Sequence, residues 1–482
     1  MFIAMVIVFI LGYTAIALEH PLKVDKAASA LLTGVALWVL FVIGADELVD
    51  WKGMFDNSIE KLEAFYHYVV DAGMQDKLGV TPAMVMSGKD LGPEATHYFV
   101  THFELLHHLG EIAEILFFLL GAMTIVEIVD QHQGFKVITD KIKTTKRIKL
   151  LWILSVLTFF MSAALDNLTT TIVMVALLRK LIADRPTRWF FASMIVLAAN
   201  AGGAWSPIGD VTTIMLWVKG EVTTIPIIRD VFLPSFVTMV LPLVILSLGQ
   251  KGNVERPQID SDSSEFTTAA QRIFILILGV SCLLFVPVFK TITHLPPYMG
   301  MLLGLGVMWL TTEVMHRDKV IGGKKHLKVT NVLSKVDVPT VLFFLGILTA
   351  VASLQSAGHL ELLAKYLDKA IGDIYIINII IGLLSAVVDN VPLVAGAMGM
   401  YNITPDNSIG EMAYYVVDGQ FWQFLAYCAG TGGSILIIGS AAGVAAMGME
   451  KIDFIWYLKK ISLLALTGYI GGAVVYYLMF GL

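Results

Sequence analysis

The chain has 482 residues, of which 57% are hydrophobic and 15% charged, and its mean hydropathy is +0.76. A soluble protein would carry about a quarter charged residues, whereas repeated apolar segments of about 20 residues give this composition. The sequence therefore predicts an all-α polytopic membrane protein. The net charge of −6 gives no sign of a nucleic-acid partner, and two cysteines, Cys282 and Cys428, form no disulfide or metal framework.

Apolar segments of span length recur along the whole chain. The first lacks the basic start of a signal peptide and is interpreted as a span. Full crossings are predicted at 1–18, 27–44, 104–129, 190–218, 230–249, 270–289, 296–315, 338–356, 421–448 and 458–480.

Two further apolar stretches, 149–183 and 374–400, are each interrupted by an Asp-Asn pair. The first is too long for one ordinary span and too short for two spans with a loop. Both are predicted to be re-entrant hairpins, because irregular backbone at membrane depth must be covered by protein or line a water-filled cavity.

The distribution of basic residues predicts the orientation of these segments. Most of the 33 Lys and Arg fall in the segments that would then be cytoplasmic. Both termini and the acidic loop 45–103 would lie outside, with an amphipathic surface helix near 58–70. The two hairpins would enter from opposite faces, so that their tips meet near the midplane. The cytoplasmic segments are 19–26, 130–149, 179–188, 250–272, 316–337 and 449–460.

Landmarks recur in order in the two halves of the chain. Ser162–Asn167 returns as Ser385–Asn390, and the glycines of Gly202–Gly209 return in Gly432–Gly439. Each half would contain one hairpin and five full spans, one of which is a glycine-broken helix (190–218 or 421–448). Because five is odd, the second repeat, 250–482, would be inverted relative to the first, 1–249.

Three aspartates in apolar surroundings are the strongest functional candidates. Carboxylates at membrane depth are costly and usually mark ion or proton paths. Asp166 and Asp389 occupy matching positions, whereas Ser440 stands where the first half has Asp210. Asp166 and Asp389 could also cap the second helix of each hairpin, a structural role that is compatible with ion binding.

The glycine-rich stretch 199–213 cannot stay a regular helix, because glycines and a proline release its backbone carbonyls. Carbonyl and hydroxyl oxygens suit a small hard cation. A hinge for close helix packing is the alternative. The candidate ion-binding residues are Asp166, Asn167, Thr169, Thr170, Asn200, Ser206, Asp210, Thr212, Thr213, Asp389, Asn390, Ser434 and Ser440, with Asp166, Asp210 and Asp389 as the Na⁺ carboxylates.

The start of the third span places His107, Glu111 and Glu114 on one helix face. A histidine with two carboxylates could relay protons or respond to pH. The alternative is a hydrated helix end whose side chains reach the headgroups.

The motifs Asp166–Thr171, Ala199–Thr213, Asp389–Pro392 and Thr431–Ser440 together resemble those of NhaD-type sodium/proton antiporters of the ion transporter superfamily. The resemblance covers about residues 100–480. It implies an inverted-repeat transporter that exports sodium, and often lithium, in exchange for protons. It also implies functional roles for His107, Glu114, the three aspartates and the polar residues of these motifs.

The expected function is exchange of cytoplasmic Na⁺ for external H⁺ by competition at a midplane carboxylate site, without enzymatic activity or a cofactor. The partners would be small inorganic cations and the bilayer of the cell inner membrane, and a homodimer is compatible with this. An anion or arsenite carrier of the same superfamily is the first alternative, since a fold does not fix a substrate. An intramembrane aspartyl protease is a weaker one, because its Gly-x-Gly-Asp signature is incomplete before Asp210.

Overall fold

The computed structural model describes residues 1–17, 19–52, 54, 59–85, 90–139, 141–249, 251–257, 267–316, 329–387 and 389–481. These residues form helices and connecting segments, and no β-strand is found among them. The predicted all-helical class is confirmed. Parts of the predicted loops 45–103, 250–272 and 316–337, and Val388 of the second hairpin, lie outside the described residues.

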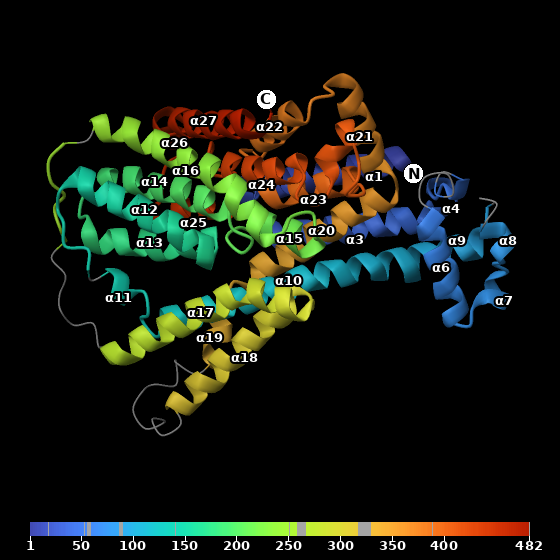
Figure 1. Ribbon diagram of the computed structural model, residues 1–482, viewed down its shortest axis with the longest axis horizontal. Coiled ribbons are helices and arrows are strands. Elements are labelled where there is room, and N and C mark those ends of the chain that lie inside the picture. The colour runs from blue at the N-terminus through green and yellow to red at the C-terminus, as the bar shows by residue number, and fades with distance from the viewer. Residues whose placement is uncertain are drawn as a thin grey trace. The chain divides into compact units, whose positions relative to one another are not determined.

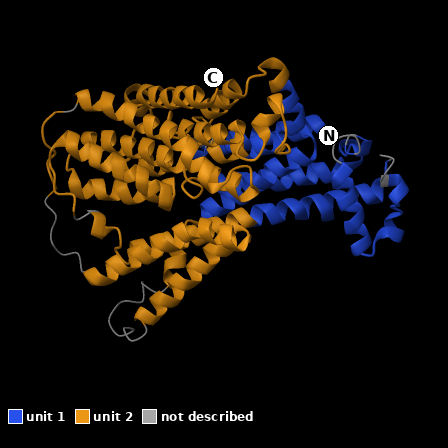
Figure 2. Cartoon of the chain, viewed as in Figure 1, with its two compact units in different colours: residues 1–113, 338–366, 395–401 blue, residues 114–337, 367–394, 402–482 orange. Residues whose placement is uncertain are grey.

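The chain divides into two compact units, coloured separately in Figure 2. Unit 1 consists of residues 1–113, 338–366 and 395–401. In its core, α3 packs against α1 and α20. Its helices are α1 (Phe2–Ala17), α2 (Glu19–Leu22), α3 (Lys26–Ile43), α4 (Ala45–Leu48), α6 (Ile59–Asp71), α7 (Gln75–Leu78), α8 (Pro82–Val85), α9 (Pro93–Tyr98), the π-helical turn η1 (Phe99–Glu104), the start of α10 (Leu105–Gln131), α20 (Val338–Ser356) and most of α21 (His359–Ala370).

Unit 2 consists of residues 114–337, 367–394 and 402–482 and contains the candidate ion site. Figure 1 shows α12, α13, α14 and α25 side by side, in agreement with their contacts. Its helices are the rest of α10, α11 (Lys136–Thr139), α12 (Arg147–Leu165), α13 (Asn167–Leu181), α14 (Arg185–Ala204), α15 (Val211–Lys219), α16 (Thr224–Gly249), α17 (Ala269–Thr293), α18 (Pro297–His316), α19 (Val329–Val332), η3 (Leu333–Lys335), α22 (Ile374–Leu384), the start of α23 (Asn390–Met400), η4 (Gly410–Tyr415), α24 (Gln420–Gly432), α25 (Ala441–Glu450), α26 (Phe454–Lys460) and α27 (Ser462–Phe480).

Eight of the described helical segments are long and apolar enough to cross a membrane. Seven of them coincide with predicted crossings, and the eighth, Arg147–Leu165, is the first arm of the predicted hairpin at 149–183. The predicted crossings 190–218 and 421–448 are each divided into two shorter helices. The first predicted span corresponds to α1, which has only 16 residues.

The helix that contains the third predicted span begins before residue 104. Its helical segment runs from Pro93 to Gln131 without interruption, instead of starting at residue 104. Polar residues near its start hid the boundary, because a helix outside the apolar core need not be hydrophobic. The helix expected near 58–70 is confirmed as α6.

Glycines at the two broken helices allow backbones to approach closely. A Cβ atom at Gly202 would lie 2.1 Å from the Phe159 carbonyl oxygen, and one at Gly432 would lie 2.0 Å from that of Gly382. Both distances are far shorter than a carbon–oxygen contact, so larger residues do not fit. At these glycines α14 packs closely against α12, and α24 against α22.

Candidate functional site

The Asp-Asn pairs mark helix breaks in the structure. Asp166 has a φ angle of 76° between α12 and α13 and caps α13. Its Oδ1 accepts a hydrogen bond from the Thr169 amide at 2.8 Å, and its Oδ2 accepts one from Thr169 Oγ1 at 2.8 Å. In the second pair, Asp389 Oδ1 accepts a hydrogen bond from the Val391 amide, in the first turn of α23, at 3.4 Å. The capping expected of both aspartates is therefore present at each break.

Asp210 lies between the two halves of the first broken helix and is 1% exposed. It caps α15 by accepting a hydrogen bond from the Thr212 amide at 3.1 Å. Its other oxygen, Oδ2, accepts from Asn167 Nδ2 at 2.7 Å and from Asn390 Nδ2 at 3.4 Å. One buried carboxylate thus accepts hydrogen bonds from the first residue of α13 and the first residue of α23.

Asn200 extends this arrangement to the second broken helix. Its Oδ1 accepts a hydrogen bond from Asn167 Nδ2 at 3.1 Å. Its Nδ2 donates to Ser434 Oγ at 2.9 Å and to Ser440 Oγ at 2.8 Å. We call the connected side chains the Asp210 network: Asn167, Asn200, Asp210, Asn390, Ser434 and Ser440.

The remaining candidates surround this network with different contacts. The charges of Asp166 and Asp389 both act on the Asp210 carboxylate. Ser206 Oγ donates to the Ala163 carbonyl at 2.5 Å, and Thr213 Oγ1 donates to the Ala204 carbonyl at 3.3 Å. The buried hydroxyls of Thr170 and Thr212 have no hydrogen-bond partner among the described residues. Buried polar atoms of this kind call for a ligand or water.

Known proteins match this chain over most of its length. The citrate transporter family matches residues 6–417. "Sodium/proton antiporter 2" of Arabidopsis thaliana is 41% identical over 98% of both chains, and "Sodium/proton antiporter 1" of the same plant is 44% identical over 98% of this chain and 72% of its own. "Na(+)/H(+) antiporter NhaD" of Vibrio cholerae is 33% identical over 78% of this chain and 80% of its own.

The chain belongs to the NhaD-type sodium/proton antiporters. The resemblance inferred from the motifs is therefore confirmed, and the protein is a membrane transporter. The Vibrio cholerae relative covers a smaller part of this chain than the plant relatives do.

The start of the third span in this NhaD-type chain differs in detail from the prediction. The His107 side chain is 62% exposed and lies 3.6 Å from a Glu111 oxygen. Both residues belong to unit 1, whereas Glu114 belongs to unit 2, where its charge acts on Lys290 of α17.

The buried ionisable residues at this position are His108 and Glu104, which the sequence analysis missed. Glu104 binds Lys61 of α6 at 2.9 Å and accepts a hydrogen bond from Ser356 Oγ at 2.7 Å. His108 contacts the same hydroxyl at 3.0 Å and a Glu111 oxygen at 3.3 Å. Glu104, His108 and Glu111 also follow a four-and-three spacing, so the signal was present but equally strong for His107.

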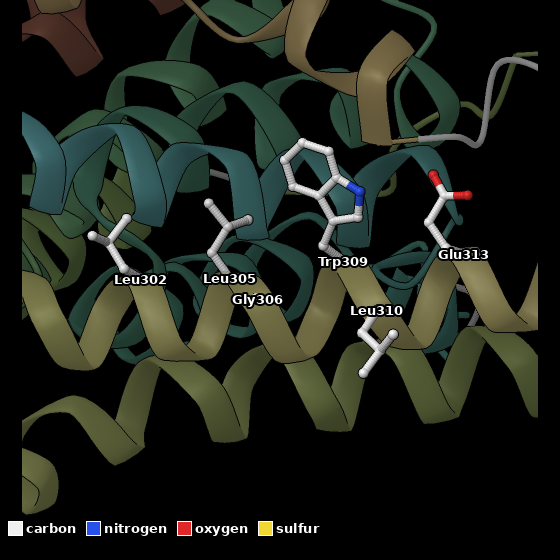
Figure 3. Close-up of a pocket in the computed structure, with 6 residues that line it drawn as sticks. All are labelled: Leu302, Leu305, Gly306, Trp309, Leu310 and Glu313. Atoms are coloured by element: carbon white, nitrogen blue, oxygen red, sulfur yellow. The ribbon is translucent and has the colours of Figure 1, made fainter.

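The described part of the chain offers few features of another ligand site. No group of three or more His, Cys, Asp or Glu side chains is arranged to hold a metal there. An apolar groove of about 430 Å³ lies along α18 and includes Trp309 and Glu313 (Figure 3). All of its lining residues come from that one helix, and none of them is a candidate site residue.

Proposed function

We propose that this protein exchanges sodium ions for protons at the Asp210 network. The observation that carries the proposal is the convergence of Asn167 and Asn390 on one buried carboxylate oxygen. Carboxylate, amide and hydroxyl oxygens are suitable ligands for a small hard cation. None of the six network side chains is basic, which fits a cation better than citrate or arsenite.

Competition between the two cations follows from burial. A carboxylate away from water is costly unless its charge is neutralised. A proton or a sodium ion can neutralise Asp210, and binding of one removes the need for the other. In the structure, Asn167 donates an N–H group to Asp210. Rotation of its side-chain amide would present the amide oxygen to a bound sodium ion instead.

Asp166 and Asp389 would extend the site to more than one proton. Their charges act on Asp210, so binding at one carboxylate changes the electrostatic free energy at the others. Two protons exchanged for one sodium would move net charge across the membrane. Sodium would enter from the cytoplasm and protons from outside, and lithium would be accepted in place of sodium.

We also propose the inverted repeat, 1–249 and 250–482, as the origin of the site. Equivalent contacts in the two halves support it: Ser162 Oγ donates to the Ala199 carbonyl at 2.6 Å, and Ser385 Oγ donates to the Ala429 carbonyl at 2.9 Å. The segments 149–183 and 374–400 would be re-entrant hairpins from opposite faces. Both termini would then lie outside the cytoplasm.

The test is transport in sealed vesicles that contain the purified protein and an internal pH indicator. Adding sodium or lithium to one side should dissipate an imposed pH gradient, whereas choline, citrate and arsenite should not. Replacing Asp166 or Asp389 by Asn should each abolish this response while the protein still inserts. Citrate-driven movement without a sodium response would contradict the proposal.

If either aspartate variant keeps near-normal exchange, the carboxylate that it lacks is not part of the ion path. Thr169→Val is a matched control for Asp166→Asn, because it removes the Oγ1 donor to Asp166 but keeps the carboxylate. It should retain most of the exchange if the Asp166 carboxylate, and not the hydrogen bond from Thr169 Oγ1, carries the function.

A further inference from the structure

The short helix α15 connects the ion site with a second charged cluster. Its N-terminal cap is Asp210, and it ends nine residues later at Lys219. Trp217, in its last turn, is fully buried and packs its ring against that of Phe118, with centroids 6.2 Å apart. Any displacement of the C-terminal end of α15 would therefore be transmitted along a rigid helix to Asp210.

The last carbonyls of a helix have no partner within the helix. At the end of α15, the amides of Gly220, Glu221 and Val222 all contact the Leu216 carbonyl. The Trp217 carbonyl instead accepts a hydrogen bond from Lys290 Nζ of α17 at 2.8 Å. A cation at this place also interacts favourably with the negative end of the helix dipole.

Lys290 makes two other kinds of contact. Its Nζ lies 4.6 Å from the centroid of the Trp217 ring, in the range of a cation–π interaction. The charges of Glu114 and Glu221 act on the same ammonium group. Glu221 follows α15 directly, and its carbonyl accepts a hydrogen bond from the Asp418 amide at 2.8 Å. The cluster therefore joins α10, α15, α17 and the turn before α24.

We propose that Lys290 is a positioning residue for the ion site. Through its hydrogen bond to the Trp217 carbonyl, it holds the C-terminal end of α15 and so sets the place of Asp210 at the opposite end. This inference rests on the proposed exchange function. It also gives Glu114 a role in positioning the site, through Lys290.

The simpler alternative is a lysine at a span end that extends toward the headgroups. That role would need only a positive or polar end group, and it would not couple to sodium binding. The two roles differ in the sodium concentration needed for half-maximal exchange, which only a positioning role would change.

The experiment measures sodium-driven exchange in vesicles that contain the Lys290→Gln or the Lys290→Arg variant. It also measures the thermal unfolding of each variant at increasing sodium concentration. Lys290→Gln should raise the half-saturating sodium concentration roughly fivefold, because a charge-assisted hydrogen bond is lost, with a smaller change in maximal rate. Lys290→Arg should restore most of the affinity. Sodium should protect the Gln variant against unfolding only at correspondingly higher concentrations.

Two controls separate the outcomes. Lys459→Gln removes a lysine at the exposed end of α26 and should leave both measurements unchanged. In a Glu114→Gln background, Lys290→Gln should have a smaller additional effect, because the two residues act together.

An unchanged half-saturating concentration in Lys290→Gln would overturn the inference, as would a loss of maximal rate alone. If Lys290→Gln does not insert, Glu221→Gln takes its place, and an unchanged sodium affinity in that variant overturns the inference equally. Absence of exchange and of sodium protection in the unaltered protein would instead refute the proposed function.

Discussion

The two glycine-broken helices share their geometry and differ in their charge. In each, a cap residue starts the second helix: Asp210 accepts from the Thr212 amide at 3.1 Å, and Ser440 accepts from the Gly443 amide at 3.1 Å. A Cβ atom at Gly203 or Gly433 would meet the carbonyl oxygen of Gly209 or Gly439, respectively. Yet only the first break carries a carboxylate.

The far ends of the same two helices differ again. The last turn of α15 is held by one lysine, Lys290. At the end of α25, the buried Glu450 binds Arg179 Nε at 2.7 Å and Arg188 Nε at 2.8 Å. The backbone carbonyl of Glu450 accepts a further bond from Trp189 Nε1 at 3.1 Å.

Two broken helices with similar backbones can therefore contribute different charges to one site. A serine cap stabilises a helix start without binding a cation strongly, whereas an aspartate cap can do both. We infer that α14–α15 supplies the charge of the site and α24–α25 supplies neutral oxygens to complete it. Ser434 and Ser440 are joined to the charged half through hydrogen bonds from Asn200.

The strongest test of this charge difference between the two broken helices is Asp210→Asn. The substitution keeps the shape of the side chain but removes the charge that a sodium ion or proton would neutralise. Exchange should fall by at least roughly 100-fold, since charged partners contribute more than neutral ones to binding a cation. Vesicle transport measures this loss, and the thermal unfolding midpoint shows whether the fold is kept. Exchange within about twofold of the unaltered protein would show that ion binding does not depend on the Asp210 carboxylate.

The second test compares Asn167→Ala with Asn390→Ala. Both asparagines donate to the same Asp210 oxygen, but at 2.7 Å and 3.4 Å. Asn167 also donates to Asn200, so its loss leaves Asn200 Oδ1 without this donor and Asp210 Oδ2 with the longer bond from Asn390. Asn167→Ala should therefore reduce exchange roughly tenfold, and Asn390→Ala less, because an unsatisfied buried polar group costs about 1–3 kcal/mol. The reverse order in transport rates would show that the second break is the dominant partner.

The sequence was sufficient to place the helix breaks. An Asp-Asn pair inside an apolar stretch, and glycines with a proline inside another, interrupt helices for reasons that depend only on nearby residues. The structure has breaks at Asp166, Asp389, Trp205–Asp210 and Gly433–Ser440 accordingly. The polar residues chosen at these breaks include all six members of the Asp210 network.

The roles within that network were not predictable in the same way. The sequence suggested a symmetric pair, Asp166 and Asp389, with Asp210 as an extra carboxylate. The direct hydrogen bonds instead join the neighbouring asparagines to Asp210. Asn167 and Asn390 lie 43 and 180 positions from Asp210 in the sequence. Tertiary packing decides whether the aspartate or the asparagine of each pair turns toward Asp210, and no local sequence pattern indicates it.

The choice between the two neighbouring histidines of the third span was not predictable for a related reason. The pattern selected His107, whereas the buried residue is His108. His107 with Glu111 and Glu114, and His108 with Glu104 and Glu111, both have the spacing of one helix face, so the sequence gives no reason to choose between the two histidines.

The smallest expected effect belongs to Ser440→Ala, which sharpens the comparison with Asp210→Asn at the matching position. The substitution removes the cap of α25 and one acceptor of Asn200 Nδ2, but Ser434 Oγ still accepts from that group at 2.9 Å. Exchange should fall only about threefold to fivefold, because losing a helix cap typically costs about 1 kcal/mol. Ser440→Thr is the matched control, since it keeps the hydroxyl and should retain more activity than the alanine variant. A loss in Ser440→Ala as large as that in Asp210→Asn would mean that the second broken helix contributes an essential ligand, and the charge difference between the halves would then no longer explain the site.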